Sequence, residues 1–538
     1  MNGQPMFTQP CDTLDALLGT PVGTVGDVLN ARVRASPDAT FLLIDGQPLT
    51  FATVARSVSS FASYLNASAA MAPRVASFLK HGAEAITVML GTHVSGATFA
   101  AINPQLRGSV LADRLTRFSP TILVTEAAGA DAVQNVLPDN CKTILFTDNI
   151  PVGFYLGAGT TISTLDAAVG ASDHTAVRSV SPESLASVIF TSGTTGRPKA
   201  VRVPHNYLCR GAARLVEGFK LREQDVIHAW LPLSHVSGQL YCVMTALVSG
   251  ASLALFPRFS AGRFWDQVCA VDATFIIGFS NVAKILMESS AVAARRHKLR
   301  IALLAGLTPE LTKAFEDRFA VRIVQAYGMT EAEPITVSRV DSREPLGSLG
   351  RPAPDFDVIV ADELDRPLPA GSVGRILARP RAPFVMMDGY EGDAEATTDA
   401  CRNLWFHSQD LGWLDSDGYL FFADRVKHAI RRRGENISAW EIEGVLRTHI
   451  GVAECAVVGV PSPLGEQEVK AVIVPAVSHR HLTPADLHEF CRAQLPLFMV
   501  PRYIEFRSHL PMTELGKVAR DALDTLGDDV WDAEAASH

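Results

Sequence analysis

The chain has 538 residues, of which 47% are hydrophobic and 20% charged, and its formal net charge is −9. This length exceeds what one hydrophobic core supports, so two to four domains are expected, and the composition excludes a disordered or fibrous protein. The negative charge is spread without long blocks of one sign, which argues against a nucleic-acid partner, because such a partner needs a basic face. The eight cysteines form no C-x-x-C pair, so neither a zinc site nor a disulfide framework is indicated.

Two stretches without charged residues, 85–106 and 229–257, are candidates for membrane spans. The second contains Pro232, His235 and several small polar residues, and its pattern breaks into helix and strand pieces, which favours a buried segment. The first fifteen residues lack the basic start and apolar core of a secretory signal. We therefore expect a soluble, cytoplasmic protein with no membrane partner.

Short apolar runs with strand character alternate with helical patterns along the first part of the chain. Strand-like runs at 74–80, 121–126 and 273–279 are each followed by a helical pattern, at 83–96, 128–137 and 281–290, and the helical run 309–319 precedes a strand at 322–328. This alternation predicts an α/β protein in which helices flank mixed, largely parallel sheets.

The pattern of predicted helices and strands changes near residue 345 and again near residue 426. Residues 355–379 read as strand, polar turn and strand, which predicts a small barrel-like subdomain at about 345–425. The last part, 426–538, is predicted to be a small mobile α+β domain after an N-terminal domain of residues 1–425. Residues 528–538 are predicted to form an acidic, frayed tail.

A Ser/Thr- and Gly-rich loop, "FTSGTTGRPKA" at 190–200, follows a predicted strand at 185–190. Backbone N–H groups in such a turn can converge on an anion, while the hydroxyls and Lys199 add donors and positive charge. The loop is predicted to hold phosphates, although it lacks the Walker spacing. Taken alone, the same residues also fit a solvated surface loop.

Three further signals are weak individually. In "QAYGMTE" (325–331), Gly328 permits a tight turn, Thr330 offers a hydroxyl and Glu331 a carboxylate suited to Mg²⁺, but the segment also fits a helix N-cap with an acidic first turn. Asp410, between strand-like runs, could bind two ribose hydroxyls or could be a turn residue. Lys517, near the C-terminus, could be catalytic or simply solvated.

Seven segments in one order resemble the superfamily of adenylate-forming enzymes, which comprises acyl-CoA synthetases, nonribosomal peptide adenylation domains and luciferases. These segments are "FTSGTTGRPKA", "LPLSHVSG", "QAYGMTE", "GSLGRPAPD", "WFHSQDLG", "ADRVKHAIRRRGENIS" and "LPMTELGKVAR". The resemblance covers nearly the whole chain and is closest in motif texture to acyl-CoA ligases. It implies a large N-terminal domain with the acid and ATP sites and a small mobile C-terminal domain.

The resemblance also implies roles for individual residues in binding ATP with Mg²⁺. The ATP-binding set would be Thr191, Ser192, Gly193, Thr194, Thr195, Gly196, Lys199, Tyr327, Gly328, Thr330, Asp410, Arg425 and Lys517. Within it, the Ser/Thr-rich loop would hold the β- and γ-phosphates, and Asp410 and Arg425 the ribose. The catalytic set would be Lys517, Thr330, Glu331 and His235, with Glu331 as the metal ligand.

Further residues would form the acid pocket, the hinge and the coenzyme A site. The acid pocket would comprise His235, Val236, Gly238, Phe279, Ser280, Gly306, Leu307 and Met329, which are mostly small or apolar and favour an apolar acyl or aryl acid. Lys427 would be the hinge. Coenzyme A would be bound by Arg432, Arg433, Gly434 and Glu435, although a basic surface turn is an alternative reading of "RRRG".

The expected reaction is ATP-dependent activation of a carboxylic acid to acyl-AMP, followed by transfer to coenzyme A, by a monomer or homodimer. An amine or a carrier protein remains open as the acceptor, and a phosphotransferase, a nucleotide-sensing binder or a luciferase-like oxygenase remain as rival classes. The sequence departs from the family pattern at Gln409 and Ala423, which replace usual glycines, and at His428, which replaces an acidic residue. These changes bear more on substrate and acceptor than on adenylation.

Overall fold

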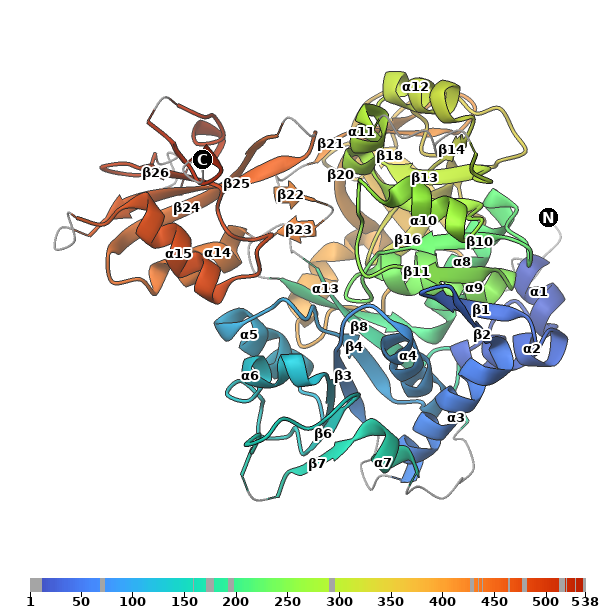
Figure 1. The fold of residues 1–538 in the computed structure, drawn as a ribbon. Helices are drawn as coiled ribbons and strands as arrows, with labels where there is room; N and C mark the ends of the chain where they lie inside the picture. Colours follow the sequence, from blue (N-terminus) through green and yellow to red (C-terminus); the bar gives the residue numbers. More distant parts are fainter. Residues whose placement is uncertain are drawn as a thin grey trace. The chain divides into compact units, whose positions relative to one another are not determined.

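The chain divides into two compact units in the computed structural model. The larger comprises residues 1–104, 115–190 and 200–426, and the smaller comprises residues 105–114, 191–199 and 427–538. The structure describes residues 12–67, 73–157, 159–170, 179–191, 198–289, 296–425, 430–433, 435–437, 439–462, 465–476, 481–511, 518, 520–527 and 529–535. Most of the elements are labelled in Figure 1.

Two seven-stranded sheets dominate the first part of the fold. In spatial order, the first consists of β14 (Arg322–Val324), β13 (Ile301–Ala305), β12 (Phe275–Phe279), β10 (Val226–Ala229), β11 (Ser252–Leu255), β1 (Thr40–Ile44) and β2 (Gln47–Thr50), and the second of β7 (Thr161–Thr164), β6 (Thr143–Phe146), β5 (Ile122–Thr125), β3 (Arg74–Phe78), β4 (Thr98–Ala101), β8 (Leu185–Thr191) and β9 (Lys199–Pro204). The pairs from β14 to β1 and from β7 to β8 are parallel, whereas β1 and β2 pair antiparallel. The expected mixed, largely parallel sheets are thus confirmed.

Helices connect and cover these sheets (Figure 1). They are α1 (Asp12–Leu18), α2 (Val25–Ala35), α3 (Phe51–Ala67), α4 (Ala83–Ser95), α5 (Gly108–Phe118), α6 (Ala130–Val133), α7 (Leu165–Gly170), α8 (His205–Phe219), α9 (Thr245–Ser249), α10 (Phe264–Ala270), α11 (Ser280–Glu288), α12 (Pro309–Phe319) and α13 (Ala394–Ala400). Their starts follow local sequence chemistry: Thr24 and Asp27 form a capping box on α2, and Thr308 caps α12 ahead of Pro309.

Two antiparallel sheets follow. The first contains β15 (Ala326–Met329), β16 (Ala332–Val337) and β17 (Arg351–Pro352), and the second contains β18 (Phe356–Ala361), β19 (Gly374–Pro380), β20 (Phe406–Leu414) and β21 (Leu420–Arg425). The second sheet pairs sequential neighbours throughout. This half-barrel sheet confirms the antiparallel, barrel-like module expected from the change of texture near residue 345.

The smaller unit contains an α+β arrangement. Its strands are β22 (Ile430–Arg432), β23 (Glu435–Ile437), β24 (Val452–Pro461), β25 (Gln467–Pro475), β26 (Tyr503–Phe506) and β27 (Trp531–Asp532), and its helices include α14 (Ala439–Arg447) and α15 (Pro484–Gln494). The expected frayed tail is wrong at Trp531 and Asp532, because β27 pairs with β26 and Asp532 forms an ion pair with Arg502 at 3.0 Å. The predicted hinge residue Lys427 lies outside the described residues.

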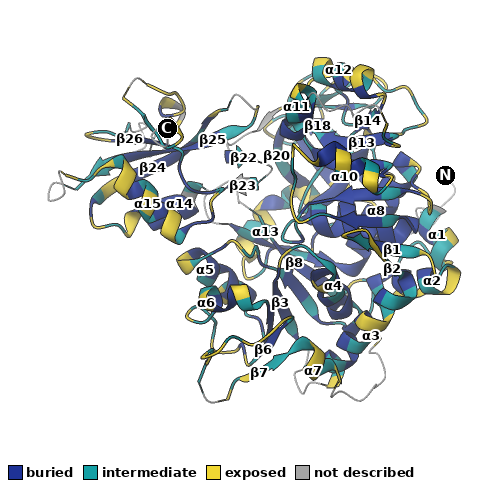
Figure 2. Ribbon diagram, viewed as in Figure 1, coloured by how far each residue is buried: buried dark blue, intermediate teal, exposed yellow. Residues whose placement is uncertain are grey.

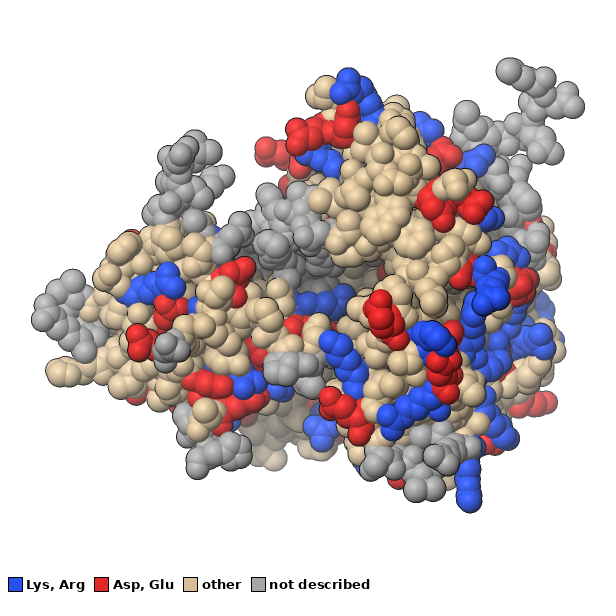
Figure 3. All heavy atoms as spheres, turned by 90° about the horizontal axis from the view of Figure 1, so that it is seen from above, with Lys and Arg blue, Asp and Glu red and all other residues tan. Residues whose placement is uncertain are grey.

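Each unit has its own hydrophobic core. Strands of the larger unit are largely buried, whereas exposed residues lie on helices such as α12 and α10 (Figure 2). The core of the smaller unit is built around Val458, Val472 and Leu523. On the face drawn in Figure 3, acidic and basic side chains are both scattered, and Lys and Arg atoms are densest at the right of the view. Among the described residues, no helix has the length and apolar character needed to cross a membrane.

His228 on β10 is buried in an aromatic cluster. Its ring stacks on Phe256 with centroids 4.1 Å apart and meets the edges of Trp230 and Phe264. Neither ring nitrogen has a hydrogen-bond partner among the described atoms, and burial lowers the pKa of His228 to about 3. The folded protein therefore keeps this imidazole neutral.

We expect His228→Phe to make the protein less sensitive to acid. In the unfolded chain His228 takes up a proton as the pH falls below about 6.5, whereas in the folded protein it stays neutral down to about pH 3. Between these two pH values protonation favours the unfolded chain, and at pH 5 the free energy of unfolding of the wild type is lower by about 2 kcal/mol for this reason. Melting temperatures of the variant and the wild type, measured at pH 8 and pH 5, should diverge in favour of the variant at pH 5. An equal difference at both pH values would contradict this explanation.

Candidate active site

Except for Met329, which lies on β15, the residues expected to line the acid pocket lie at or after the carboxyl ends of three neighbouring parallel strands. β10 pairs with β12 and β12 with β13, so Phe279 lies opposite Ala305 at the last register position. The three strands lead into Trp230, Ser280 and Gly306 respectively. In open α/β sheets, ligands bind beyond the carboxyl ends of the strands. The structure thus brings the three loops of the predicted pocket to one sheet edge.

The loop after β10 is fixed by close backbone contacts. The His235 N–H donates to Pro232 O at 3.1 Å, and the Gly238 N–H donates to His235 O at 3.1 Å. A Cβ on Gly238 would overlap Pro232 O, so only glycine fits there. A π-helix, Ser237–Met244, follows directly, and such wide turns are frequent at functional sites.

A buried hydrogen-bonded chain supports this loop from behind. The Gln239 Nε2 group donates to Leu233 O at 2.7 Å, and its Oε1 accepts from the Ser187 hydroxyl at 2.8 Å. Ser187 also lies 3.0 Å from His93 Nε2. Since Ser187 is part of β8, which ends at Thr191, the chain connects α4, β8 and the π-helix. Gln239 therefore fixes the carbonyl two residues before His235.

Thr330 and Glu331 form the two-residue turn of the β15–β16 hairpin. Met329 pairs with Ala332 across the turn and Tyr327 pairs with Thr336. The alternative reading of this segment as a helix N-cap is therefore wrong. A Cβ on Gly328 would overlap the carboxylate of Glu333 and approach Ala332 O, so the hairpin needs glycine at this position.

Two tyrosine hydroxyls hold the turn. Tyr207 on α8 donates to Thr330 O at 3.0 Å, and Tyr390 donates to Glu331 Oε1 at 2.7 Å. Burial, reinforced by the charge of Glu331, raises the pKa of Tyr390, which therefore remains a donor at all ordinary pH values. The Glu331 carboxylate is thus oriented by a fixed hydrogen bond. Among the described residues, no group of three or more His, Cys, Asp or Glu side chains could hold a metal ion.

Asp410 and Tyr327 meet although they are 83 positions apart in sequence. The Tyr327 hydroxyl donates to Asp410 Oδ2 at 2.9 Å, and both residues are buried. Asp410 lies in a bulge of β20, because Arg375 pairs with Leu411 and Leu377 with His407, which leaves Ser408–Asp410 opposite a single residue. Bulges re-aim side chains, and they are common beside active sites. Arg425, whose backbone pairs with Asp410, ends β21.

Gln409, within this bulge, has a left-handed backbone with a φ of 64°. This is the position where the resembling family usually has glycine. A non-glycine residue with a left-handed backbone destabilises the folded state by about 1–2 kcal/mol. Glycine avoids this strain, but it lowers stability by about 0.5–1 kcal/mol because it loses more chain entropy on folding.

We expect Gln409→Gly to stabilise the protein by about 0.5–1 kcal/mol, because relief of the strained φ exceeds the entropy cost. Urea denaturation of the variant and the wild type measures this difference. The control is Asn403→Gly on the exposed 3₁₀ turn Arg402–Leu404, where φ is also positive, at 54°. A smaller gain is expected there because Asn tolerates this region. A destabilised Gln409→Gly variant would contradict the strain argument.

Several predicted site residues lie outside the described part of the chain. They are Ser192, Gly193, Thr194, Thr195, Gly196, Lys427, Gly434 and Lys517. At the two ends of the phosphate loop, Thr191 is the last residue of β8 and Lys199 the first of β9. Of Arg425, the structure describes the backbone, as the last residue of β21.

Arg432 does not fit its expected role in coenzyme A binding. Its guanidinium is buried, donates to Phe498 O at 3.1 Å and Val500 O at 2.8 Å, and forms an ion pair with Glu468. These contacts hold Arg432 inside the smaller unit, so its guanidinium does not face a coenzyme A molecule. Arg433, by contrast, is exposed and lies 3.6 Å from Glu534, and Glu435 begins β23.

Sequence reasoning missed the residues that support the site. Tyr207, Tyr390, Gln239 and Ser187 were not predicted; the first three contact a predicted segment directly, and Ser187 acts through Gln239. Tyr390 stands in "MMDGYEGD", next to glycines and acidic residues that read as an ordinary turn. Only Gln239 had a signal in the sequence. It is a polar side chain within an apolar helical run, directly after Gly238, and a buried amide needs a hydrogen-bond partner.

Comparison with known proteins places these features in a family. Residues 29–391 match the AMP-binding enzyme family, and residues 441–517 match the AMP-binding enzyme C-terminal domain. The chain therefore belongs to the AMP-binding enzymes, which confirms the adenylate-forming superfamily inferred from the seven motifs.

Individual relatives give more detail. A crotonobetaine/carnitine–CoA ligase of Salmonella typhimurium is 30% identical over 458 residues, covering 84% of this chain and 88% of the relative. The amide bond synthetase McbA of Marinactinospora thermotolerans is 26% identical with a TM-score of 0.79, covering 93% and 99%. The o-succinylbenzoate CoA synthetase MenE of Bacillus subtilis is 22% identical, with a TM-score of 0.79 over 92% and 98% of the two chains, and shows the shared fold.

Proposed function

We propose that this protein is an AMP-forming ligase that activates a carboxylic acid with ATP and transfers the acyl group to coenzyme A. The observation that carries the proposal is the 2.9 Å hydrogen bond between Tyr327 and Asp410, two buried residues from separate motifs that the family resemblance assigns to one nucleotide. The similarity to a crotonobetaine/carnitine–CoA ligase supports this choice of reaction.

The nucleotide would be bound mainly by backbone and oxygen-bearing groups. Asp410 and Arg425 would hold the ribose hydroxyls, Tyr327 would lie near the adenine and Thr330 would contact the α-phosphate. The β- and γ-phosphates would be held by the loop that begins at Thr191 and ends at Lys199. The tethering of the hairpin turn by Tyr207 and Tyr390 supports these roles, because preorganised donors need not reorganise during the reaction.

Mg²⁺ fits the donor set at Glu331. This cation prefers oxygen ligands and is usually bound by one or two carboxylates together with substrate phosphates, not by a cage of side chains. Glu331 offers such a carboxylate, held by Tyr390. When bound, the ion would neutralise phosphate charge, and the protein's contribution is to keep Glu331 in position.

The reaction would proceed in two balanced halves. A carboxylate oxygen of the acid attacks the α-phosphorus of ATP, the bond to the β-phosphate oxygen breaks, and pyrophosphate leaves. The thiol of coenzyme A then attacks the acyl carbon, loses its proton, and expels AMP. Lys517 would offset the repulsion between the two anions in the first half, so positioning and charge neutralisation dominate over covalent participation.

The acid is proposed to be apolar. The pocket set His235, Val236, Gly238, Phe279, Ser280, Gly306, Leu307 and Met329 contains no Lys, Arg, Asp or Glu to bind a second charge on the acid. An apolar acyl or aryl acid is therefore the proposed substrate class.

An amine acceptor is the second candidate, supported by the likeness to the amide bond synthetase McbA. Arg433, Gly434 and Glu435 remain the proposed contacts for coenzyme A, whereas an amide synthetase has no need of them. Charge reversal, Arg433→Glu, should therefore raise the KM for coenzyme A only if a thioester is formed.

Acid-dependent exchange of pyrophosphate into ATP tests the first half of the reaction. Purified protein would be supplied with aromatic, short-chain and medium-chain acids, and at least one should support exchange. Coenzyme A or amines are then added with that acid. AMP with thioester supports the proposal, AMP with amide supports the alternative, and release of ADP, or no turnover with any acid, refutes both.

A further inference from the structure

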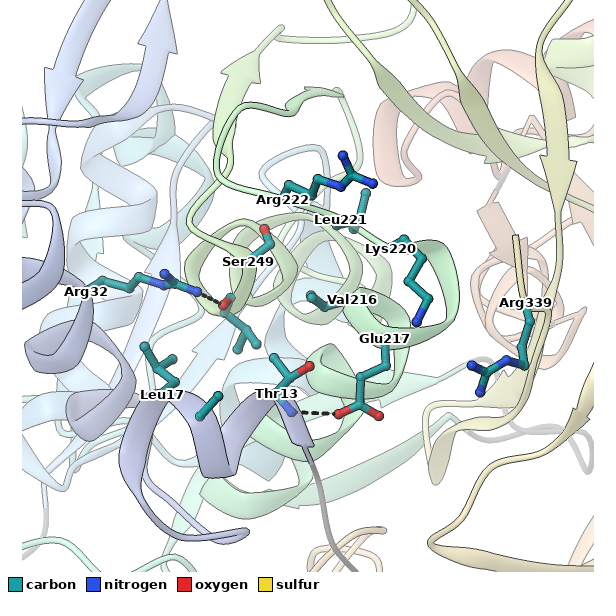
Figure 4. A pocket seen from close by; sticks show the side chains of 12 residues that line it. Thr13, Leu17, Arg32, Val216, Glu217, Lys220, Leu221, Arg222, Ser249 and Arg339 are labelled. Carbon is teal, nitrogen blue, oxygen red and sulfur yellow. Dashed lines mark hydrogen bonds between the residues drawn. The ribbon is translucent and has the colours of Figure 1, made fainter. Parts of the chain in front are cut away.

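A cavity of about 560 Å³ lies in the larger unit, bordered by α1, α2, the end of α8 and α9. This volume falls in the range of small-molecule sites. Figure 4 shows side chains from these four helices grouped around a common space, with Leu221 and Arg222 of the loop after α8 above them. None of the cavity residues belongs to the motifs assigned to ATP, acid or coenzyme A.

The cavity lies at the opposite sheet edge from the acid pocket. Its lining residues Lys220, Leu221 and Arg222 come before β10 begins at Val226, and Ser249 comes before β11 begins at Ser252. Parallel neighbours share one direction, and the acid-pocket loops follow the carboxyl ends of β10, β12 and β13. The cavity is therefore separate from the candidate active site.

The middle of the cavity is apolar. Leu17 of α1, Val216 of α8 and Val248 of α9 contribute aliphatic side chains to its wall. Val216 lies near the centre of the view in Figure 4, and Leu17 lies to its lower left, below Arg32. A surface of this kind has nothing to offer a bare inorganic ion and would favour a ligand with an apolar body.

Four cations surround this apolar middle. They are Arg32, Lys220, Arg222 and Arg339, and Glu217 is the only carboxylate among the described lining residues. In Figure 4, Arg32 lies on one side, Arg222 above, and Lys220 with Arg339 on the other side. The lining residues themselves thus carry an excess of positive charge, while Glu223 and Asp341, outside the lining, pair with three of the four cations.

The cations differ in how firmly they are already paired. Arg32 is buried and fixed, because it donates to Leu247 O and Val248 O and pairs with Glu223 at 2.9 Å. Lys220 and Arg339 share the exposed Asp341, at 3.6 and 3.4 Å. Exposed pairs of this length contribute little, so both side chains can turn to another anion at small cost. Glu217 is occupied by the Thr13 N–H at 2.9 Å.

We propose that this cavity binds a small amphipathic anion, one with an apolar body of several carbons and a single carboxylate or phosphate head group. The body lies against Leu17, Val216 and Val248, and the head group meets Lys220, Arg222 and Arg339 at the rim. Arg32 provides a fixed positive charge beside it. This inference goes beyond the proposed ligase reaction and does not depend on it.

Calorimetric titration of the full-length protein tests the proposal with three probes: hexyl phosphate, octanoate and inorganic phosphate. A non-hydrolysable ATP analogue is present at saturation, so that phosphate contacts in a nucleotide site are already occupied. Hexyl phosphate or octanoate should bind saturably. Inorganic phosphate should bind at least about tenfold more weakly, because it lacks the apolar body.

Paired charge reversals locate the binding. Lys220→Glu with Arg222→Glu should weaken binding of the organic probes by at least about tenfold. The control pair, Lys80→Glu with Lys313→Glu, alters exposed lysines elsewhere by the same net charge and should bind like the wild type. Arg339→Glu, on a separate segment, should also weaken binding and keeps the test valid if the first pair does not fold.

The organic probe that binds identifies the head group. Binding of octanoate alone indicates a carboxylate ligand, and binding of hexyl phosphate alone indicates a phosphate ester. Either result supports the proposal. The proposal would be overturned if the Lys220/Arg222 variant and the Lys80/Lys313 variant bound the organic probes with equal affinity. It would also be overturned by tight binding of inorganic phosphate, or by the absence of saturable binding of any probe. Adenylation by the cavity variants should stay at the wild-type level, which separates this result from the fate of the ligase proposal.

Discussion

Lys517→Ala is expected to lower acid-dependent pyrophosphate exchange by about two decades or more. In the proposed mechanism this lysine supplies the positive charge that allows a carboxylate to approach the negatively charged α-phosphate, and loss of one such stabilising group typically costs about 10²–10³ in rate. Exchange of labelled pyrophosphate into ATP, with an acid identified in the screen, measures the effect.

The second half-reaction provides an internal control for Lys517. When chemically prepared acyl-AMP is supplied with coenzyme A, thioester formation should proceed near the wild-type rate, because the anion–anion approach has already taken place. Lys313→Ala, which removes an exposed lysine that pairs with Asp317, should leave both halves unchanged. Near-normal exchange by Lys517→Ala would refute the assignment of this residue.

Asp355→Ala is expected to produce the largest loss of stability, about 3–5 kcal/mol. Asp355 precedes β18 and binds Arg210 and Arg214 of α8, all three being almost fully buried, so the substitution leaves two buried cations without their carboxylate. Arg214 also donates to Glu333 O and Pro334 O at 3.2 Å, which connects this cluster to the β15–β16 hairpin. Urea denaturation measures the loss.

Asp357→Ala is the matched control for Asp355. Asp357 lies on β18, is partly exposed, and pairs with Arg379 of the neighbouring strand β19 at 2.9 Å, so its removal should cost less than about 1 kcal/mol. A similar cost for the two substitutions would contradict the importance assigned to burial.

The pH dependence gives a second check on Asp355. Burial alone would raise its pKa, but Arg214 and Arg210 outweigh burial and hold the pKa of Asp355 below its ordinary range. The contribution of the cluster should therefore be complete above about pH 4 and decline only as the pH falls further.

The regular part of the fold could be predicted because its signals are local. Buried runs such as Phe275–Phe279 carry strand character, and Thr308 and Pro309 mark the start of α12. The candidate site was predictable only in its motif residues. Among these the contact between Tyr327 and Asp410 required the structure, because nothing local relates positions 83 apart.

The misses have a common physical origin. A sequence gives the type of a side chain but not the direction of its polar atom, so the hydroxyls of Tyr207 and Tyr390 carried no signal. Arg432 was read with its two basic neighbours as a surface run, yet a β-strand turns alternate side chains to opposite faces and directs Arg432 inward. Trp531 and Asp532 were read as tail because two residues are too few for a strand pattern.

The π-helix Ser237–Met244 has a consequence for how this protein could have changed over time. A wide turn of this kind holds one residue more than an α-helical turn, and one residue corresponds to about 100° of rotation around a helix axis. Deleting a single position there would turn Gly238 and Gln239 out of phase with Thr245–Ser249. The rotation of α9, whose carbonyls accept from Arg32, is thus coupled to the orientation of the loop that bears His235. Deletions of single residues in the π-helix should therefore be rare among functional descendants.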